Sequence, residues 1–203
     1  MFKFCIWVLV SLPVIDLFVL AYFNELGANP QEVILRDLGN WSLVLLLLIF
    51  AIPVLSKVGL ESLISCRRML GLWSFFYLNL HLLAFLIFEN EFNLSSFLND
   101  LIHRPFVTFG FLSFCLLVPL AVTSNNFSMK LYGKFWKKIH KLITPAIIFA
   151  IVHYFFHREA KGDFSDPTIA LIIFLLIWSA RSLVSKLSRK KLTSLKIANS
   201  DSK

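Results

Sequence analysis

Six long apolar runs divide the 203-residue chain. A helix that crosses a bilayer needs about 20 mostly apolar residues, because lipid tails offer no partner for backbone polar groups. The runs that come near this requirement lie at residues 4–23, 38–55, 69–88, 105–122, 139–156 and 168–184. The sequence therefore predicts an all-α integral membrane protein, a six-transmembrane-helix bundle within residues 1–184, followed by a basic cytoplasmic tail at 185–203.

Composition supports a membrane protein and excludes other classes. Only 16% of the residues are charged, whereas soluble domains average about 25%. The net charge of +8 does not indicate a nucleic-acid partner, because the cations lie in short connectors beside the apolar runs. The cysteines Cys5, Cys66 and Cys115 form no CxxC pair, so they give no zinc, disulfide-scaffold or c-type heme signature.

The distribution of lysine and arginine predicts the orientation. Only Arg36, Arg104, Arg158 and Lys161, of 20 such residues, fall in the connectors that follow the first, third and fifth runs. The positive-inside rule then places those connectors in the periplasm and both termini in the cytoplasm of a bacterial inner membrane. The first run lacks a small-x-small cleavage site, which favours an uncleaved helix.

One acidic residue interrupts the first run. Asp16 is costly in lipid, so it either faces the bundle or a cofactor, or lies near a membrane interface. The sequence leaves both positions open.

Three of the five histidines lie inside apolar runs, where an imidazole indicates a functional site. His81 is in the third run, and His140 and His153 are in the fifth, about 20 Å apart in helical rise. The third and fifth runs cross the membrane in the same direction, which brings His81 nearer the level of His153. We therefore predict that His81 and His153 ligate one heme iron from opposite sides. His103 and His157 are expected to be interfacial, although His157 shares a helix face with His153.

His140 has no histidine at its level on the third run. The residues there are Arg67 and Arg68. A heme at His140 would need another axial ligand, and the arginines either neutralise heme propionates or serve as topology charges.

Several short motifs in sequential order resemble those of the MsrQ (YedZ) family, the heme-binding membrane subunits of the MsrPQ methionine sulfoxide reductase system, within the wider ferric-reductase-like transmembrane group. The matching stretches are Leu26-Gly-Ala-Asn-Pro30, Arg67-Arg-Met-Leu-Gly-Leu-Trp73, Leu80-His-Leu82, His103-Arg-Pro-Phe106, Leu120-Ala-Val-Thr-Ser124, Tyr132-Gly-Lys-Phe-Trp-Lys-Lys-Ile-His140 and Ile151-Val-His-Tyr154. Relatives often carry Asn or Arg and then an aromatic residue where Lys141-Leu-Ile-Thr144 follows His140 here.

The resemblance implies a six-helix bundle that binds one or two b-type hemes through the positions of His81, His140 and His153. It also implies electron delivery to an MsrP-type periplasmic molybdopterin reductase, which repairs oxidised methionine in proteins. The donor would be the quinone pool or a cytoplasmic flavin reductase, with FMN or quinone as a further cofactor.

Two other functions compatible with the same residues stay open. One is a transmembrane ferric or other metal reductase with the same heme core, and the other is a non-redox transporter whose histidines bind protons or substrate. The chain has no GxGxxG or P-loop pattern, so we expect the donor and the final acceptor to be separate molecules.

Overall fold

The computed structural model describes residues 1–159 and 162–200, and within them the regular structure is entirely helical. Six helical segments are long and apolar enough to cross a membrane. The all-α, six-helix class predicted from the sequence is therefore confirmed. Lys161 and residues 201–203, which belong to a predicted connector and to the predicted tail, lie outside the described residues.

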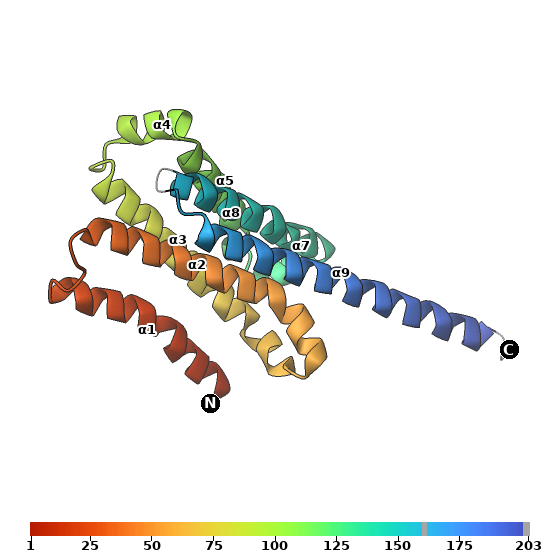
Figure 1. Cartoon of the computed structure of the whole chain (residues 1–203). Coiled ribbons are helices and arrows are strands. Elements are labelled where there is room, and N and C mark those ends of the chain that lie inside the picture. Colours follow the sequence, from red (N-terminus) through yellow and green to blue (C-terminus); the bar gives the residue numbers. More distant parts are fainter. Residues whose placement is uncertain (160–161, 201–203) are drawn as a thin grey trace.

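Figure 1 shows the order and arrangement of these helices. The long helices are α1 (Phe2–Tyr22), α2 (Pro30–Leu55), α3 (Arg67–Phe88), α5 (Pro105–Val122), α8 (Ile143–Glu159) and α9 (Ser165–Ser200). The shorter elements are η1 (Ser56–Val58), η2 (Glu61–Cys66), α4 (Leu94–His103), α6 (Asn126–Tyr132), α7 (Lys134–Ile139) and η3 (His140–Leu142).

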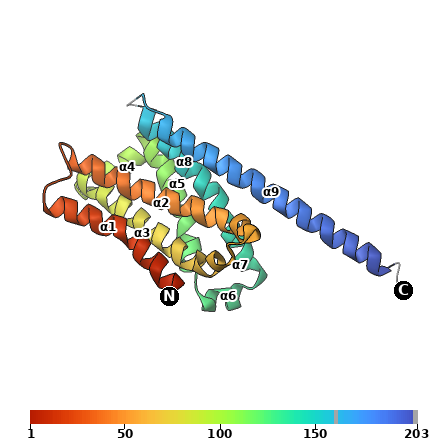
Figure 2. The same cartoon turned by 60° about the horizontal axis from the view of Figure 1, so that its bottom comes forward.

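Connections at both ends of the bundle join consecutive long helices, which run antiparallel to each other. We call one end of the bundle the α4 end and the other the α6 end (Figure 2). The α4 end carries the α1–α2, α3–α5 and α8–α9 connections, and the α6 end carries the N-terminus and the α2–α3 and α5–α8 connections.

Local sequence explains where several helices begin. Pro30 and Pro105 occupy the first position of α2 and α5, where a missing N–H costs nothing. The Asn29 side chain accepts a hydrogen bond from the backbone N–H of Glu32, which caps α2. α2 begins eight residues before the apolar run at 38, because its first two turns mix apolar residues with charged ones.

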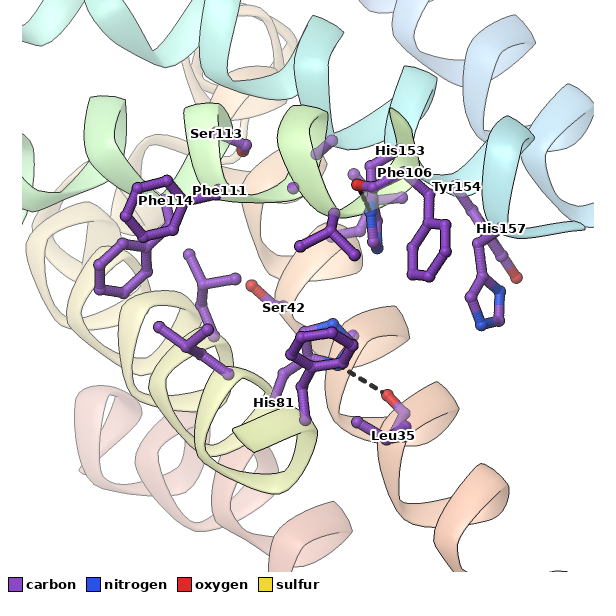
Figure 3. Close-up of a pocket in the computed structure, with 18 of the residues that line it drawn as sticks. Leu35, Ser42, His81, Phe106, Phe111, Ser113, Phe114, His153, Tyr154 and His157 are labelled. Atoms are coloured by element: carbon purple, nitrogen blue, oxygen red, sulfur yellow. Dashed lines mark hydrogen bonds between the residues drawn. The ribbon is translucent and has the colours of Figure 1, made fainter. Parts of the chain in front are cut away.

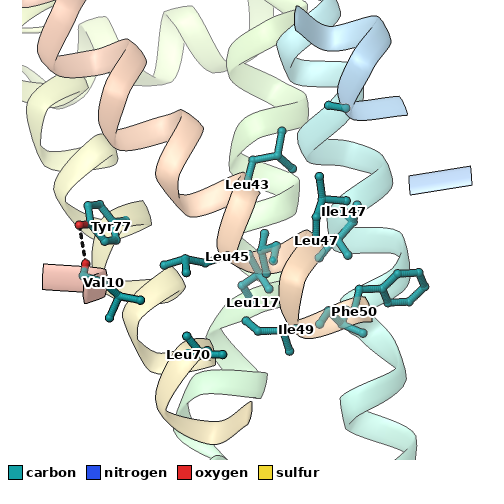
Figure 4. Close-up of a cluster of buried hydrophobic side chains, with 14 of the residues drawn as sticks. Val10, Leu43, Leu45, Leu47, Ile49, Phe50, Leu70, Tyr77, Leu117 and Ile147 are labelled. Carbon is teal, nitrogen blue, oxygen red and sulfur yellow. Dashed lines mark hydrogen bonds between the residues drawn. The ribbon is translucent and has the colours of Figure 1, made fainter. Parts of the chain in front are cut away.

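The core of the bundle is built around α2. Half of its most apolar membrane window is buried, against 11% for α1 and for α9. Its inward-facing residues include Leu45, Ile49 and Phe50, which join Ile147 of α8 in one hydrophobic cluster (Figure 4). α1 and α9 are therefore peripheral, and α2, α3, α5 and α8 form the central four-helix unit.

α9 is fixed to α2 by one cation. The Arg181 guanidinium donates a hydrogen bond to the carbonyl of Phe50 over 2.7 Å and lies 4.2 Å from the centre of the Phe50 ring. Such a cation–π contact is strongest where water is scarce. α9 then continues to Ser200, past residue 184, where the sequence predicted the last helix to end.

Two further differences from the sequence predictions concern single residues. Asp16 is exposed on α1, so it does not line the interior of the bundle. His140 does not open the fifth long helix, because the 3₁₀ turn η3 separates α7 from α8.

The first helix is held to the third by a tyrosine at a proline. Pro13 has no N–H and its ring displaces nearby carbonyls, which interrupts the hydrogen bonding of α1. Directly after it, the Val14 N–H donates to the Tyr77 hydroxyl over 3.1 Å, and this hydroxyl donates to the Val10 carbonyl over 2.8 Å. Tyr77 thus inserts between two groups that a regular helix pairs with each other.

Tyr77→Phe should weaken the docking of α1 against α3. The Val14 N–H and the Val10 carbonyl would lose their partner in an apolar environment, at a cost of about 1–3 kcal/mol. Thermal unfolding of the purified protein in detergent measures this loss. Tyr22→Phe is a matched control because Tyr22 is exposed, and equal melting temperatures for the two variants would contradict the bridging role.

Candidate functional site

A cavity lies between the helix pair α2/α3 and the helix pair α5/α8. Its volume is about 130 Å³. Most of its wall is apolar, with Leu46 and the ring residues Phe111 and Phe114 among the lining side chains. Figure 3 shows His81 and His153 pointing into this central cavity from opposite walls.

The two imidazoles are neighbours. The ring centres of His81 and His153 are 6.1 Å apart, and the ring planes are nearly perpendicular, at 84°. The residues come from α3 and α8, which are separated by more than 50 positions in sequence. The structure therefore brings together His81 and His153, the two histidines that were predicted from helical rise to lie at a similar depth in the membrane.

Each of these rings is held by a backbone carbonyl. His81 Nδ1 lies 2.8 Å from the Leu35 oxygen of α2, and His153 Nδ1 lies 2.6 Å from the Phe106 oxygen of α5. A carbonyl only accepts, so Nδ1 carries the proton in both rings, and each Nε2 keeps its lone pair. An imidazole that donates its other N–H in this way is oriented and made more basic as a metal ligand.

The surroundings of the two histidines repeat. Gly39 lies against the His81 ring, and Gly110 lies against the His153 ring. Each glycine is four residues after the carbonyl that holds the ring. The glycines are 71 positions apart and the histidines 72, so α2/α3 and α5/α8 present equivalent half-sites.

Serine hydroxyls connect the helices within each half-site. Ser42 and Ser74 donate to each other's carbonyl over 3.1 and 2.9 Å, which joins α2 to α3. At the equivalent place Ser113 donates to the Ala146 carbonyl over 2.9 Å, which joins α5 to α8. These buried bonds fix the spacing of the helices one to two turns below the imidazoles.

Polar side chains gather at one part of the cavity wall. Arg36, Asn40, Tyr154 and His157 line it, whereas Ser42 and Ser113 already use their hydroxyls between helices. Tyr154 and Arg158 both bind the Asp166 carboxylate at the start of α9. The cavity is therefore apolar around the imidazoles and has hydrogen-bonding groups at the α4 end.

The short helix α4 covers this end of the cavity. Its Phe97 lines the cavity and contacts the rings of Phe85 and Phe111. Buried polar groups hold the segment in place: the Asn90 amide donates to Asp100 over 2.9 Å, and Asp100 forms an ion pair with Arg104 at 3.2 Å. α4 is thus anchored by a carboxylate that few other residues could replace.

His140 lies away from the central cavity. Its ring stacks on Trp136 with centres 3.9 Å apart, and its Nδ1 is 3.1 Å from the Trp136 carbonyl. Its Nε2 is 3.5 Å from the Ser124 hydroxyl. Arg67 is half-buried within electrostatic range of both His140 and Arg181. His140 and Arg67 thus share the α6 end, as their helix depths predicted.

The remaining histidines and the second arginine are placed as follows. His103 is exposed at the end of α4 with Nδ1 2.9 Å from the Asn99 carbonyl, and it does not line the cavity. His157 does line it, and its ring lies 6.2 Å from that of His153. Arg68 donates to Asn126 of α6 over 2.7 Å.

Sequence reasoning missed the two glycines and the polar rim of the cavity. A signal for the glycines was present, because Gly39-Asn-Trp-Ser42 and Gly110-Phe-Leu-Ser113 share a G-x-x-S pattern on helices of the same direction. No comparable pattern marks Arg36 or Asn40. The carbonyls of Leu35 and Phe106 carry no sequence signal, since every residue has one.

Comparisons with known proteins agree with this architecture. The family model described as "Ferric reductase like transmembrane component" matches residues 38–151, which contain all of α3 and α5 and most of α2. The match also contains His81 and His140 but ends two residues before His153. The fold and the site thus define a multi-pass membrane protein of the ferric-reductase-like class.

Curated relatives narrow the class to one family. A "Protein-methionine-sulfoxide reductase heme-binding subunit MsrQ" of Ralstonia nicotianae is 37% identical over 183 residues, 87% of this chain and 84% of the relative. The protein of the same description from Herminiimonas arsenicoxydans is 38% identical over 89% of this chain and 87% of the relative, and that of Brucella ovis is 35% identical over 85% and 80%. The chain belongs to the MsrQ family, which supports a role in membrane electron transfer. No solved structure shows a significant match.

The anchor of α4 can be tested apart from any cofactor. Asp100→Ala should remove one of the two acceptors of the buried Asn90 amide and the shorter of the two ion pairs of Arg104, at a cost of about 1–3 kcal/mol. Hydrogen exchange of the α4 amides should then become about 10-fold faster or more. Asp163→Ala is the control, because Asp163 is an exposed carboxylate whose hydrogen bonds among the described residues go to Ser165. Equal exchange in both variants would contradict the anchoring role.

Proposed function

We propose that the protein binds a b-type heme in the central cavity, with His81 and His153 as axial ligands, and carries electrons across the membrane. The observation that supports this most directly is the pair of facing imidazoles, each with its Nδ1 occupied by a carbonyl. An imidazole nitrogen binds a transition metal at about 2.0–2.1 Å, and the ring centre lies roughly 1 Å further, so two rings on one metal have centres about 6 Å apart. The measured 6.1 Å fits that arrangement.

The rest of the donor set favours heme over a bare metal ion. Within the part of the chain that the structure describes, no group of three or more His, Cys, Asp or Glu residues is placed to hold a metal. Two imidazoles in an apolar cavity leave the other coordination positions to a macrocycle. The chain has no CxxCH motif, so the heme is held without thioether bonds, as in b-type proteins.

The polar groups of the cavity suggest how a heme is oriented. Arg36, Asn40 and His157 are lining side chains that can bind propionate carboxylates at the α4 end, whereas the Tyr154 hydroxyl already donates to Asp166. The apolar wall toward Leu46 and Phe114 would suit the edge of the macrocycle that carries only vinyl and methyl groups.

When bound, the heme supplies reversible one-electron chemistry, and the protein supplies its environment. The apolar wall excludes water, and the two imidazoles together with the nearby charge of Arg36 set the reduction potential. We propose that α4 faces the periplasm, because the lysine- and arginine-rich connectors are at the α6 end. The heme then lies on the periplasmic side of the bundle.

The family of the chain supports the direction and the partners. We propose that electrons enter from the quinone pool or a cytoplasmic flavin reductase. They then leave to an MsrP-type periplasmic molybdopterin reductase at a bacterial inner membrane. His140, with Arg67 beside it, is the candidate for a second, inner cofactor site, where a second heme, FMN or a quinone would bridge the distance from the cytoplasmic face.

Substitution of the histidines tests the proposed ligands. His81→Ala and His153→Ala should each abolish the low-spin heme spectrum of the purified protein, because each removes one axial ligand. His140→Ala should retain the spectrum of the central heme. His103→Ala is the matched control, since His103 is exposed at the membrane surface and makes an equivalent ring-to-carbonyl contact.

Two results would contradict this proposal. A normal low-spin spectrum in His81→Ala would rule out the pairing, and wild-type protein without a Soret band or pyridine hemochrome would rule out heme itself. The second outcome would favour a non-redox transporter.

The match to the ferric reductase class favours one other function, the reduction of ferric iron by the same heme. The protein is first reduced with dithionite and freed of excess reductant. Reoxidation by an MsrP-type reductase, and not by ferric chelates, is expected. The reverse result would assign the protein as a metal reductase.

A further inference from the structure

We propose that Gly39 and Gly110 are positioning residues that allow helix carbonyls to hold the two axial imidazoles. This inference rests on the proposed heme ligation and adds the reason why the rings have one orientation. It assigns a role to two residues that make no side-chain contact of their own.

The geometry of an α-helix explains the need for glycine. A helix carbonyl points along the axis toward the N–H four residues later, and the Cβ at that later position leans back toward the N-terminus, over the same carbonyl. A broad, rigid side chain such as an imidazole therefore has most room to reach the carbonyl where the residue four positions later has no Cβ. Gly39 follows Leu35 by four residues, and Gly110 follows Phe106 by four.

The distances at both positions agree with this rule. A Cβ placed on Gly110 would lie 2.8 Å from His153 Nδ1, closer than real contacts allow. A Cβ placed on Gly39 would lie 3.2 Å from His81 Nδ1 and from its Cε1, which is tight but can be relieved by a small shift. In both half-sites the atom that would be displaced is the nitrogen that bonds the carbonyl.

The consequence concerns the iron ligands and not only packing. A displaced ring lengthens or loses its hydrogen bond to Leu35 or Phe106, and its Nε2 then becomes a weaker donor. A weaker axial donor stabilises the ferric state less, so the heme potential should rise. The ring also turns, which changes the 84° angle between the two ligand planes.

The experiment compares three single alanine variants of the full chain in lipid nanodiscs. Gly71→Ala is the control, because Gly71 lies in α3 with no neighbouring atom within 4 Å of an added Cβ. Glycine-to-alanine changes favour helix formation in themselves. A loss in the two test variants alone therefore cannot come from a general effect of alanine.

Three measurements report on the ligands: the low-spin EPR anisotropy, the midpoint potential and the rate of heme transfer to apomyoglobin. Gly110→Ala should release heme about 10–100-fold faster than wild type, the range seen when the hydrogen-bond partner of a ligating histidine is lost. Gly39→Ala should show a smaller change in the same direction. Both should have a higher potential and altered EPR anisotropy, and Gly71→Ala should match wild type.

Each outcome is decisive. If Gly110→Ala and Gly39→Ala both match Gly71→Ala, the positioning role is wrong while heme ligation stands. If Gly110→Ala does not reach the membrane, Gly39→Ala alone decides, because its closest contact leaves room to fold. If wild-type protein contains no heme, the proposed function fails and the role of the glycines fails with it.

Discussion

The absence of water in the hydrocarbon layer is the constraint on which the rest of this structure depends. Every polar group at that depth has to find a partner inside the protein. The serines of the central helices donate to carbonyls of neighbouring helices, and Tyr77 bridges the interruption that Pro13 makes in α1. The two central imidazoles obey the same rule through the Leu35 and Phe106 carbonyls. The two hydrogen bonds that satisfy these imidazoles inside the membrane are therefore also the bonds that orient them as candidate ligands.

This shared origin explains why the site is built as two equivalent halves. Each half is a pair of antiparallel helices in which one helix contributes a carbonyl and a glycine and the other contributes a histidine. One half alone offers a single imidazole on an apolar wall. A ligand that needs two axial donors can bind only when the halves face each other, so helix packing and cofactor binding should stabilise one another.

The peripheral elements divide according to the end of the bundle that they serve. α4, which the ion pair of Asp100 with Arg104 anchors, covers the polar rim of the cavity, and the proposed orientation places this rim toward the periplasm. The α6 end instead gathers the His140 imidazole with Arg67 and Arg181, two cations without an acidic partner among the described residues. The two ends therefore differ in charge, which suits different electron-transfer partners. α1 and α9 lie at the periphery of the central four-helix unit.

The sequence by itself determined the class and the six helices, and it predicted that His81 and His153 lie close together, as the structure places them. Hydropathy, the distribution of lysine and arginine and helical rise follow from the order of residues along the chain, and they need no knowledge of packing. It did not determine that His140 lies in a 3₁₀ turn against Trp136, because the turn depends on contacts between residues distant in the chain. Nor did it identify Leu35, Phe106, Gly39 or Gly110, whose contributions are a carbonyl and an empty space. Only the tertiary structure could show these features, since a backbone group gains a particular role when another helix places an imidazole beside it.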